Sequence, residues 1–398
     1  MPRKTPVVAV NPTVLEWARR ASGFSQNDVA RHLGLTSSQI TMWNTNVPHV
    51  YLRVRQLQEL ADYFKRPLAS LLLEKPPADL KLPHDYRRAR AEYSALSPDL
   101  MLSIRRARRY QRIARELMDS AELSVTPMIP KVSINQKPED VAYKQRKIFG
   151  INEREQFGWR DSRVAYRRWR EMLETHNILV FQNDFLRDEA QGFSLSDNLP
   201  YVIMVSYKDS VNARCFTLFH ELAHLLLNEG GLCITETAYA HRHDHSSDIE
   251  NWCNRFAESF LVSESSLITR LETSAIINKE PGYEYSLRRL ALVYKVSQSV
   301  ILFRLWHTNL ISEERFWDEF SIVQESLKED ASKEVKKEEQ RGPSPAVMSV
   351  QNRGKFLTNL IIQSLDRQIL GYSEAIDYLG IRLKHLDKVR MIVRGERA

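Results

Sequence analysis

The sequence predicts an α+β protein that is predominantly helical, and three observations support this fold class. Residues 10–75 contain short apolar-periodic segments separated by turn residues, which is typical of a compact helical unit. Residues 135–330 mix helical segments with two short runs typical of strands, at 177–182 and 201–207. A charged run with proline and glycine at 327–345 has the composition of a linker. We therefore expect a helical bundle, a larger domain with a small sheet, and a small helical C-terminal region.

Composition limits the class of protein. The chain has 398 residues, of which 43% are hydrophobic and 27% charged, so it is too long for one ordinary domain and too hydrophobic for a disordered chain. No stretch reaches the roughly 18 uninterrupted apolar residues of a membrane helix, and the N-terminus lacks an apolar signal segment. We therefore expect a cytoplasmic protein with no membrane segment. The net charge of +7 permits a polyanionic partner without identifying one. Cys215, Cys233 and Cys253 form no paired spacing, which favours reduced buried thiols.

The N-terminal segment carries the pattern of a helix-turn-helix. Ser25 is placed to cap a helix over 26–33, which Gly34 ends. Thr36 is placed to cap a second helix over 37–44, across a short turn from the first. The residues expected to face inward are Val29, Ala30, Leu33, Ile40 and Trp43. This spacing suits a recognition helix held against its neighbour.

A proline-bearing exit and a basic segment follow this unit. Two further short helices over 52–73 are broken before Pro67, and the prolines beyond them indicate a domain boundary near residue 76. The next segment, 86–123, is helical and heavily basic, with few acids. Its arginines are Arg87, Arg88, Arg90, Arg105, Arg106, Arg108, Arg109, Arg112 and Arg115. Two interpretations compete: a solvated helix face, and contact with a nucleic-acid backbone.

A His-Glu-x-x-His motif lies in the apolar run FTLFHELAHLLLNEGG, residues 216–231. On a helix, residues four apart lie about 40° apart around the axis, so His220 and His224 share one face and can bind one metal ion. Neutral imidazoles are good zinc ligands, and the neighbouring Glu221 can take a proton from the attacking water. Burying these groups without partners would cost several kcal/mol, an objection that a metal removes. The motif predicts metal-dependent hydrolysis, and histidines merely hydrogen-bonded in a core are the alternative.

A catalytic zinc normally takes three protein ligands and a water, so a third ligand is sought elsewhere. Three groups compete: histidines of the loop HRHDH, acids of the helix after it, and glutamates beside a glycine turn. The loop histidines are His241, His243 and His245, and the glutamates are Glu229 and Glu236. On the helix over 248–263, Glu250 falls on the flank of the buried stripe, whereas Glu258 points nearly the opposite way. Glu250 is the preferred ligand. The histidines lie in a polar loop that suits a solvated or substrate-edge role, and no neighbouring element evidently holds the two glutamates in place.

Two motifs together carry a family resemblance. The run 216–227 with its HExxH is followed by a Glu-x-x-x-Asn-x-Phe-Ala pattern, here Glu250, Asn254, Phe256 and Ala257. This pair resembles the ImmA/IrrE metallopeptidases. Cys253 stands where the family has alanine, and Leu-Val-Ser at 261–263 replaces the usual ending, departures that are conservative for the chemistry. The resemblance implies a zincin-like domain with a gluzincin-like third ligand, in which His220, His224 and Glu250 bind Zn²⁺ and Glu221 is the general base.

The resemblance extends upstream. Residues 191–221 are similar to the family's approach to the motif, and 65–87 resemble the linker of members that carry an N-terminal Xre-type helix-turn-helix. By resemblance to Xre-type repressors, Gln26 lies near a phosphate and the base-facing residues are Ser37, Ser38 and Met42. Asn-Thr-Asn at 44–46 replaces the family's Glu-x-Gly, and Asn46 can adopt the left-handed turn that glycine otherwise serves. DNA, bound by a homodimer, is the implied partner; a structural or protein-binding helical domain is the alternative.

The function expected from these features is a DNA-binding regulatory zinc metallo-endopeptidase. Its substrate, by the resemblance, is a partner repressor or antitoxin, and oxyanion-stabilising candidates are Tyr207, Tyr239 and His241. One alternative is a DNA-binding regulator or antitoxin whose zinc site is sensory or structural; another is a zinc hydrolase of non-peptide substrates. The expected segments are a helix-turn-helix domain 1–75, a basic helical linker 76–130, a metallopeptidase domain 131–330, a charged linker 331–346 and a helical region 347–398.

Overall fold

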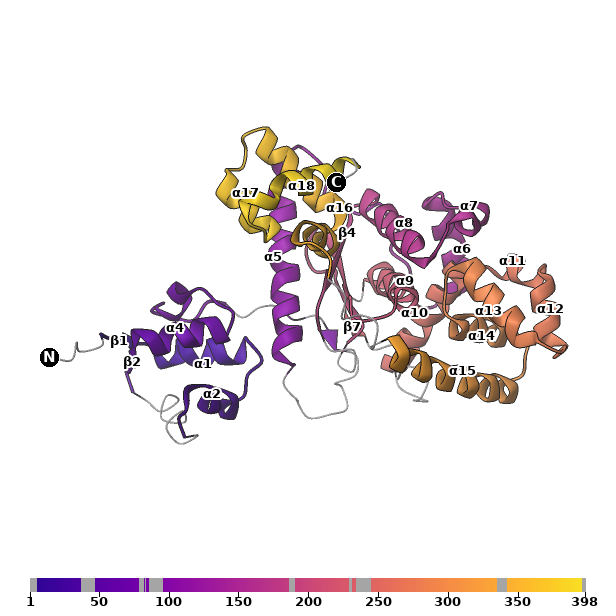
Figure 1. Ribbon diagram of the computed structural model, residues 1–398, viewed down its shortest axis with the longest axis horizontal. Coiled ribbons are helices and arrows are strands. Elements are labelled where there is room, and N and C mark those ends of the chain that lie inside the picture. Colours follow the sequence, from indigo (N-terminus) through magenta and orange to yellow (C-terminus); the bar gives the residue numbers. More distant parts are fainter. Residues whose placement is uncertain are drawn as a thin grey trace. The chain divides into compact units, whose positions relative to one another are not determined.

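The computed structural model is predominantly helical, with two small sheets (Figure 1). It describes residues 6–36, 47–78, 82, 84–85, 96–185, 190–228, 231–233, 245–334 and 342–395. The chain divides into two compact units, Met1–Leu82 with Arg88–Arg108 and Pro83–Arg87 with Arg109–Ala398, so the boundary falls within one helix, α5 (Pro98–Ser120). Among the helices described, none is long and apolar enough to cross a membrane.

The helices of the first unit begin and end at the capping residues that the sequence contains. The elements are β1 (Val7–Val10), α1 (Pro12–Arg20), α2 (Gln26–Leu33), β2 (Val50–Arg53), α4 (Val54–Tyr63), the 3₁₀ helix η2 (Leu68–Leu71) and the start of α5. Ser25 and Asp28 form a capping box at the start of α2, and Gly34 ends it with φ 65°. The predicted helix over 26–33 is therefore confirmed. Its predicted partner over 37–44, with Ser37, Ser38, Ile40, Met42 and Trp43, lies outside the described residues.

A two-stranded ribbon in this unit was not expected from the sequence. β1 and β2 pair antiparallel, with Val8 opposite Leu52 and Val10 opposite Val50. The prediction of a short helix from residue 52 is wrong for its first two residues, which belong to β2; the helix α4 begins at Val54. Val10 of β1 and Leu52 of β2 are both buried in the hydrophobic core of this unit. The paired strands therefore cover part of that core.

The basic helix α5 uses several of its arginines for contacts within the protein. Arg105 donates to the backbone carbonyls of Phe64 and Lys65 in the first unit. In the second unit, Arg109 pairs with Asp377 at 2.5 Å. Arg112 and Arg115 each lie near an acid one turn further on, Glu116 and Asp119. Arg105 and Arg109 thus take part in contacts within the protein, while Arg87, Arg88 and Arg90 lie outside the described residues. Both interpretations of the basic segment stay open.

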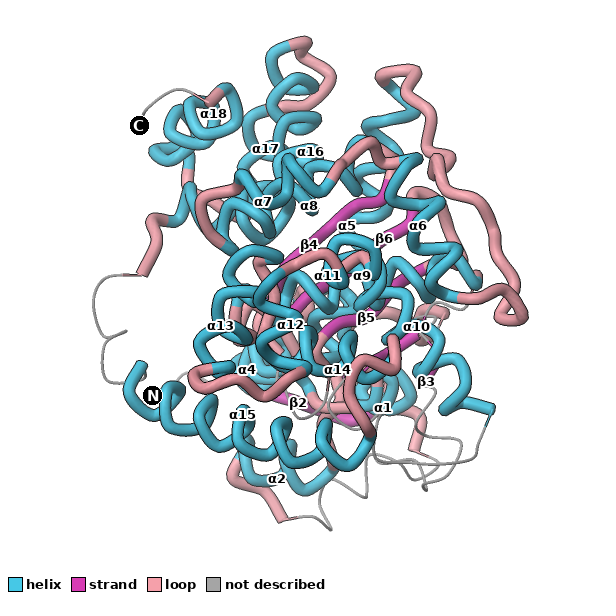
Figure 2. The backbone as a smooth tube through the Cα atoms, turned by 90° about the vertical axis from the view of Figure 1, so that its right-hand side faces the viewer, coloured by secondary structure: helices cyan, strands magenta, loops and turns pink. Residues whose placement is uncertain are grey.

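The second unit contains a five-stranded mixed sheet in the order β3-β7-β5-β6-β4. Its strands are β3 (His84–Asp85), β4 (Ile178–Asn183), β5 (Gly192–Leu195), β6 (Tyr201–Ser206) and β7 (Gly231–Cys233). β4 and β6 run parallel and side by side (Figure 2), whereas β5 is antiparallel to both β6 and β7. The two strands predicted from the sequence are confirmed as β4 and β6. The other three, with two to four residues each, are too short for a periodic signal.

Helices cover both faces of this sheet. On one face, Val180, Ile203 and Val205 pack in the same core as α8 (Ser162–Thr175) and α9 (Val211–Leu227). On the other face, the ring of Phe181 meets Tyr110 of α5 edge to face at 5.2 Å. Every residue of β4 and β6 is buried, which explains their continuous apolar runs without alternation.

The helix α10 (His245–Leu261) packs against α9, and on the rest of its surface it contacts α6 and α14 of a further group of helices. These are α6 (Pro138–Ile148), α7 (Glu153–Gly158), α11 (Glu264–Ile268), α12 (Leu271–Ile277), α13 (Tyr283–Tyr294), α14 (Gln298–His307) and α15 (Glu313–Glu334). The carbonyls at the end of a helix have no partner within it. Here Arg146 donates to the carbonyl of Phe260 at 2.6 Å, and the amide of Gln156 donates to that of Leu261 at 3.0 Å. The C-terminal end of α10 is thus held by side chains from α6 and α7.

The C-terminal helices belong to the same compact unit as the sheet. They are α16 (Pro345–Asp366), α17 (Tyr372–Leu379), the 3₁₀ helix η4 (Leu383–His385) and α18 (Leu386–Arg394). α16 packs beside β4 and is kinked at Gly354, where φ is 81° and an added Cβ would overlap the carboxylate of Glu174. The carbonyl of Gln351 accepts from Gln182 of β4 at 3.0 Å and from Arg170 of α8 at 2.5 Å.

Both ends of the segment expected as a linker, 331–346, are helical in the structure. α15 continues to Glu334 and α16 begins at Pro345, while 335–341 lie outside the described residues. Lysines and glutamates are good helix formers, so a charged run can extend a helix as readily as interrupt one.

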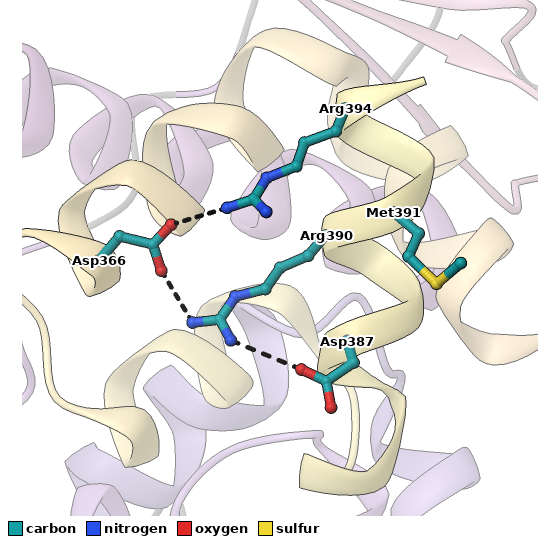
Figure 3. A pocket seen from close by; sticks show the side chains of 5 residues that line it. All are labelled: Asp366, Asp387, Arg390, Met391 and Arg394. Atoms are coloured by element: carbon teal, nitrogen blue, oxygen red, sulfur yellow. Dashed lines mark hydrogen bonds and ion pairs between the residues drawn. The ribbon is translucent and has the colours of Figure 1, made fainter. Parts of the chain in front are cut away.

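A shallow pocket of about 400 Å³ lies between the end of α16 and α18 (Figure 3). Asp366 accepts from Arg390 at 2.8 Å and from Arg394 at 3.4 Å, and Asp387 lies 3.5 Å from Arg390. Met391 completes the lining. Since its two arginines are paired with its own two acids, this pocket offers no unbalanced charge to a ligand.

Candidate metal centre

The helix α9 is a core helix that carries three polar side chains at its middle. Ser210 caps its start by accepting from the backbone N–H of Ala213 at 3.2 Å, and Asn228 ends it in the left-handed conformation. Most of its side chains pack in the apolar core. His220, Glu221 and His224 are nonetheless 0% exposed. The helix therefore buries the whole HExxH motif in a low-dielectric environment, where unpaired polar groups are costly.

Glu250 reaches this motif from α10. The Nε2 atoms of His220 and His224 lie 3.1 Å apart. One carboxylate oxygen of Glu250 lies 3.2 Å from Nε2 of His220, and the other lies 3.4 Å from Nε2 of His224. Among the described residues, these three form a buried group whose ligand atoms all lie within 4.8 Å of one another. Two elements remote in sequence thus converge on one point.

This geometry fits a metal ion. Ligand atoms held 2.0–2.1 Å from a zinc ion at tetrahedral angles lie roughly 3.3 Å from one another. The two imidazole nitrogens lie 3.1 Å apart, and each lies 3.2 or 3.4 Å from a different oxygen of Glu250, so each of these pairs is close to that value. Two imidazoles and one carboxylate are also the donor set of catalytic zinc sites, which keep a fourth position for water. The residues present therefore suit zinc in both chemistry and spacing.

The two acids of α10 take the sides of the helix that their spacing predicts. Glu250 faces the histidines, whereas Glu258 lies against α14, where its carboxylate is 2.6 Å from Nδ1 of His307. The structure thus brings together His220, His224 and Glu250 and leaves Glu258 out. Of the other ligand candidates, His241, His243, Glu229 and Glu236 lie outside the described residues, as does the side chain of His245 at the start of α10.

Glu221 is the least satisfied group of the site. Neither of its carboxylate oxygens has a hydrogen-bond partner among the described residues. Burial raises the pKa of Glu221 to about 8, against smaller lowering effects of His224 and the Ser194 hydroxyl. A buried carboxylate with this pKa is a stronger base than an ordinary glutamate. Its two oxygens lack the hydrogen-bond partners that buried polar atoms normally have.

The strand β5 passes directly beside Glu221. Ser194 is fully buried on this strand. At Gly192, an added Cβ would lie 2.6 Å from Cγ2 of Thr217 and 3.3 Å from Oε1 of Glu221. Only glycine permits this close approach of strand to helix. Sequence reasoning missed both residues, because the segment GFS at 192–194 carried no motif beyond its likeness to the family.

Burial and hydrogen bonding set the charge states of the ligands. Burial lowers the pKa of His220, which favours the neutral imidazole that a metal requires. Burial alone would raise the pKa of Glu250, but the charge of His224 and hydrogen bonds with both imidazoles hold it below its usual range. A neutral imidazole at His220 beside an ionised carboxylate at Glu250 gives protonation states in which both of these groups can bind a cation.

Two neighbouring residues of α10 touch the histidines from outside. The side-chain oxygen of Asn254 lies 2.8 Å from Nδ1 of His220, and the thiol of Cys253 lies beside His224. Cys215 and Cys253 are buried free thiols, as the sequence predicts. Tyr207, a candidate for oxyanion stabilisation, is 38% exposed after β6, and Tyr239 lies outside the described residues.

Comparison with known proteins places this site within a matched segment. Residues 173–306 match the family described as the IrrE N-terminal-like domain, Peptidase_M78. The segment runs from the end of α8 into α14 and contains all four residues of the site. No curated protein matches the chain. Among solved structures, a Mycobacterium tuberculosis transcriptional regulator is similar at 15% identity, over 49% of this chain and 51% of that chain. Its TM-score of 0.30 is too low to support an argument about fold or function.

Proposed function

We propose that this protein is a zinc-dependent peptidase, with His220, His224 and Glu250 as metal ligands and Glu221 as general base. The observation that carries the proposal is a fully buried carboxylate with two orphan oxygens, adjacent to a converged pair of imidazoles and a second carboxylate. Burying such groups without partners costs several kcal/mol, and a bound cation with its water removes that cost. The match of 173–306 to a peptidase family supports the same assignment.

The residues have separate tasks in peptide hydrolysis. A zinc ion in this site would polarise the scissile carbonyl and lower the pKa of a water molecule. The side chain of Glu221 accepts one proton from the attacking water, so that the hydroxyl oxygen bonds to the carbonyl carbon. As the C–N bond breaks, Glu221 returns that proton to the leaving nitrogen, and atoms and charge balance. Exclusion of bulk water by the core around α9 strengthens each of these interactions.

The proposed substrate is a partner repressor or antitoxin, and the proposed role is regulation of transcription. The resemblance to ImmA/IrrE proteins motivates this substrate class, and the peptidase match is compatible with it. We also propose that the first unit binds DNA as a homodimer. The capped helix α2 supports this, since Gln26 opens it and Gly34 ends it, as the helix-turn-helix pattern requires of its first helix.

A second candidate function is a DNA-binding regulator or antitoxin whose zinc site is sensory or structural. Burial favours it: His220, Glu221 and His224 are 0% exposed and Glu250 is 8% exposed. Structural zinc sites are closed, whereas catalytic sites keep an accessible position. The two candidates share the ligands and differ in whether Glu221 performs chemistry.

Zinc content tests the shared part of both candidates. We expect about one zinc per wild-type chain, loss of zinc in Glu250→Ala, and retention in Glu221→Gln, measured by elemental analysis at matched folding by circular dichroism. A wild-type protein without zinc, or an indifferent Glu250→Ala variant, would overturn the metal site.

A comparison of wild type with Glu221→Gln in cells separates catalysis from sensing. Mapping of protein N-termini is expected to reveal new termini that appear with the wild type and not with Glu221→Gln. If the termini are the same while both proteins retain zinc, the second candidate is favoured.

A further inference from the structure

The three ligands of the proposed zinc site do not by themselves determine which nitrogen of His220 faces the metal. An imidazole has two ring nitrogens, and a neutral ring carries its single proton on one or the other. Only the deprotonated nitrogen can bind a metal. Some neighbour of the ring therefore has to select the tautomer.

Asn254 is placed to make this selection. It follows Glu250 by four residues on α10, so the two side chains lie one turn apart on the same face of the helix. Its side-chain oxygen is 2.8 Å from Nδ1 of His220, and both residues are 0% exposed. Water cannot replace this contact from bulk solvent, because the pair is fully enclosed.

The chemistry of the contact determines the proton's position. An amide oxygen can only accept a hydrogen bond, so Nδ1 of His220 has to donate. The proton then sits on Nδ1, and Nε2 keeps its lone pair. It is Nε2 that lies 3.1 Å from Nε2 of His224 and 3.2 Å from Glu250. The lone pair thus points to the centre of the three-ligand group.

We infer that Asn254 is a positioning residue, whose side-chain oxygen fixes His220 as the Nδ1–H tautomer and directs Nε2 to the metal. This inference rests on the proposed function. The helix α10 then supplies one ligand, Glu250, and also orients a second ligand, His220 of α9. Partners of this kind outside the ligand set orient metal-binding histidines and raise their basicity. Sequence reasoning used Asn254 only as part of a family pattern and assigned it no task.

The first experiment measures zinc affinity by competition with a chromophoric chelator at pH 7.5. Asn254→Leu keeps a similar volume and removes the acceptor, and we expect it to weaken zinc binding about 10–100-fold. Asn254→Asp keeps an acceptor at the same place and is expected to retain most of the affinity. Asn251 is exposed on the same helix, so Asn251→Leu is the matched control and is expected to leave the zinc affinity unchanged.

The outcomes distinguish this inference from the proposed function. If the wild type binds zinc, Glu250→Ala loses it, and a folded Asn254→Leu binds as tightly as wild type, the inference is overturned and the metal site stands. If the wild type and Glu250→Ala bind equally or not at all, the proposed metal site fails.

A second readout covers the case in which Asn254→Leu does not fold. Nitrogen-15 spectra of the imidazoles in zinc-free wild type report directly which nitrogen of His220 carries the proton. The signature of an Nδ1–H tautomer is expected, assigned by its disappearance in His220→Gln. An Nε2–H tautomer in the folded wild type would overturn the inference whatever the affinities.

Discussion

Two buried polar clusters lie along α10, and they differ in how completely the protein satisfies them. At the C-terminal end of the helix, Arg146 donates to Phe260 and to the amide oxygen of Gln156, and Gln156 donates to Leu261 and Tyr294. In its first half, Glu250 faces the HExxH motif, and both oxygens of Glu221 lack a partner among the described residues. Both clusters are secluded from solvent.

The difference separates a cluster whose hydrogen bonds the protein completes from one that it leaves incomplete. Complete pairing is what a stable fold requires of buried polar groups, because each unpaired group costs about 1–3 kcal/mol. Residual unpaired atoms persist where a ligand or reacting group completes the set. The cluster at Arg146 therefore stabilises the fold, whereas the unpaired oxygens of Glu221 lower its stability. This contrast supports the proposed metal site beside Glu221.

The largest effect is expected from breaking the structural cluster. Arg146→Ala leaves the carbonyl of Phe260 and the amide oxygen of Gln156 without their donor, and it removes packing against Trp169. We expect a loss of about 3 kcal/mol or more in the free energy of unfolding, measured by urea denaturation. A loss below about 1 kcal/mol would show that solvent or rearrangement replaces these bonds.

The next effect is a pH dependence that comes from Glu221. Its pKa is about 8 in the fold, above its ordinary value of 4.5, so the folded state binds a proton more tightly than the unfolded state. Stability is therefore full below about pH 4.5 and falls as the pH rises towards 8. In zinc-free protein we expect the wild type to lose about 3 kcal/mol relative to Glu221→Gln between pH 5 and 8. Parallel stability curves for the two proteins would contradict this.

A smaller loss is expected where β5 approaches Glu221, the proposed general base. Gly192→Ala places a methyl group against Thr217 and near Glu221, and we expect about 1–2 kcal/mol of destabilisation by thermal unfolding. Gly158→Ala is the control, since Gly158 lies at the end of α7 with open space around its Cα and tolerates a methyl group. Equal effects of the two substitutions would argue against close packing at Gly192.

The smallest effect is expected at Cys253. A thiol is a weak hydrogen-bonding group, in contrast to the amide of Asn254 beside it. Cys253→Ala introduces the residue found in the resembled family, and we expect zinc affinity to fall by less than about tenfold, below the range typical of strong outer partners. A larger loss in the chelator competition would give the thiol a role in holding His224.

Prediction from sequence succeeded where the signal is local. Ser25 and Gly34 mark the two ends of the helix α2, and they could be recognised because capping depends on neighbours three or four residues away. Helical spacing likewise separated Glu250 from Glu258, since both positions are fixed relative to one helix axis. The strands β4 and β6 were recognised because burial on both faces leaves a continuous apolar run.

Prediction failed where contacts join remote segments. The ribbon of β1 and β2 consists of two four-residue strands whose pairing partner is 40 residues away or more, so neither carries a periodic signal. The docking of α16 on β4 depends on the kink at Gly354 and on the acceptor at Gln351, which no spacing rule connects to residues near 180.

The sequence by itself identified the proposed ligands and base, His220, His224, Glu250 and Glu221. The HExxH motif is recognisable alone, helical periodicity favoured Glu250 over Glu258, and the family resemblance agreed with both. Only the tertiary structure decided what surrounds them. It placed Asn254 on His220, brought Gly192 and Ser194 of β5 beside Glu221, and left the oxygens of Glu221 unpaired. The physical reason is that hydrogen bonding and desolvation depend on distances of a few ångströms between elements, which one-dimensional spacing does not encode.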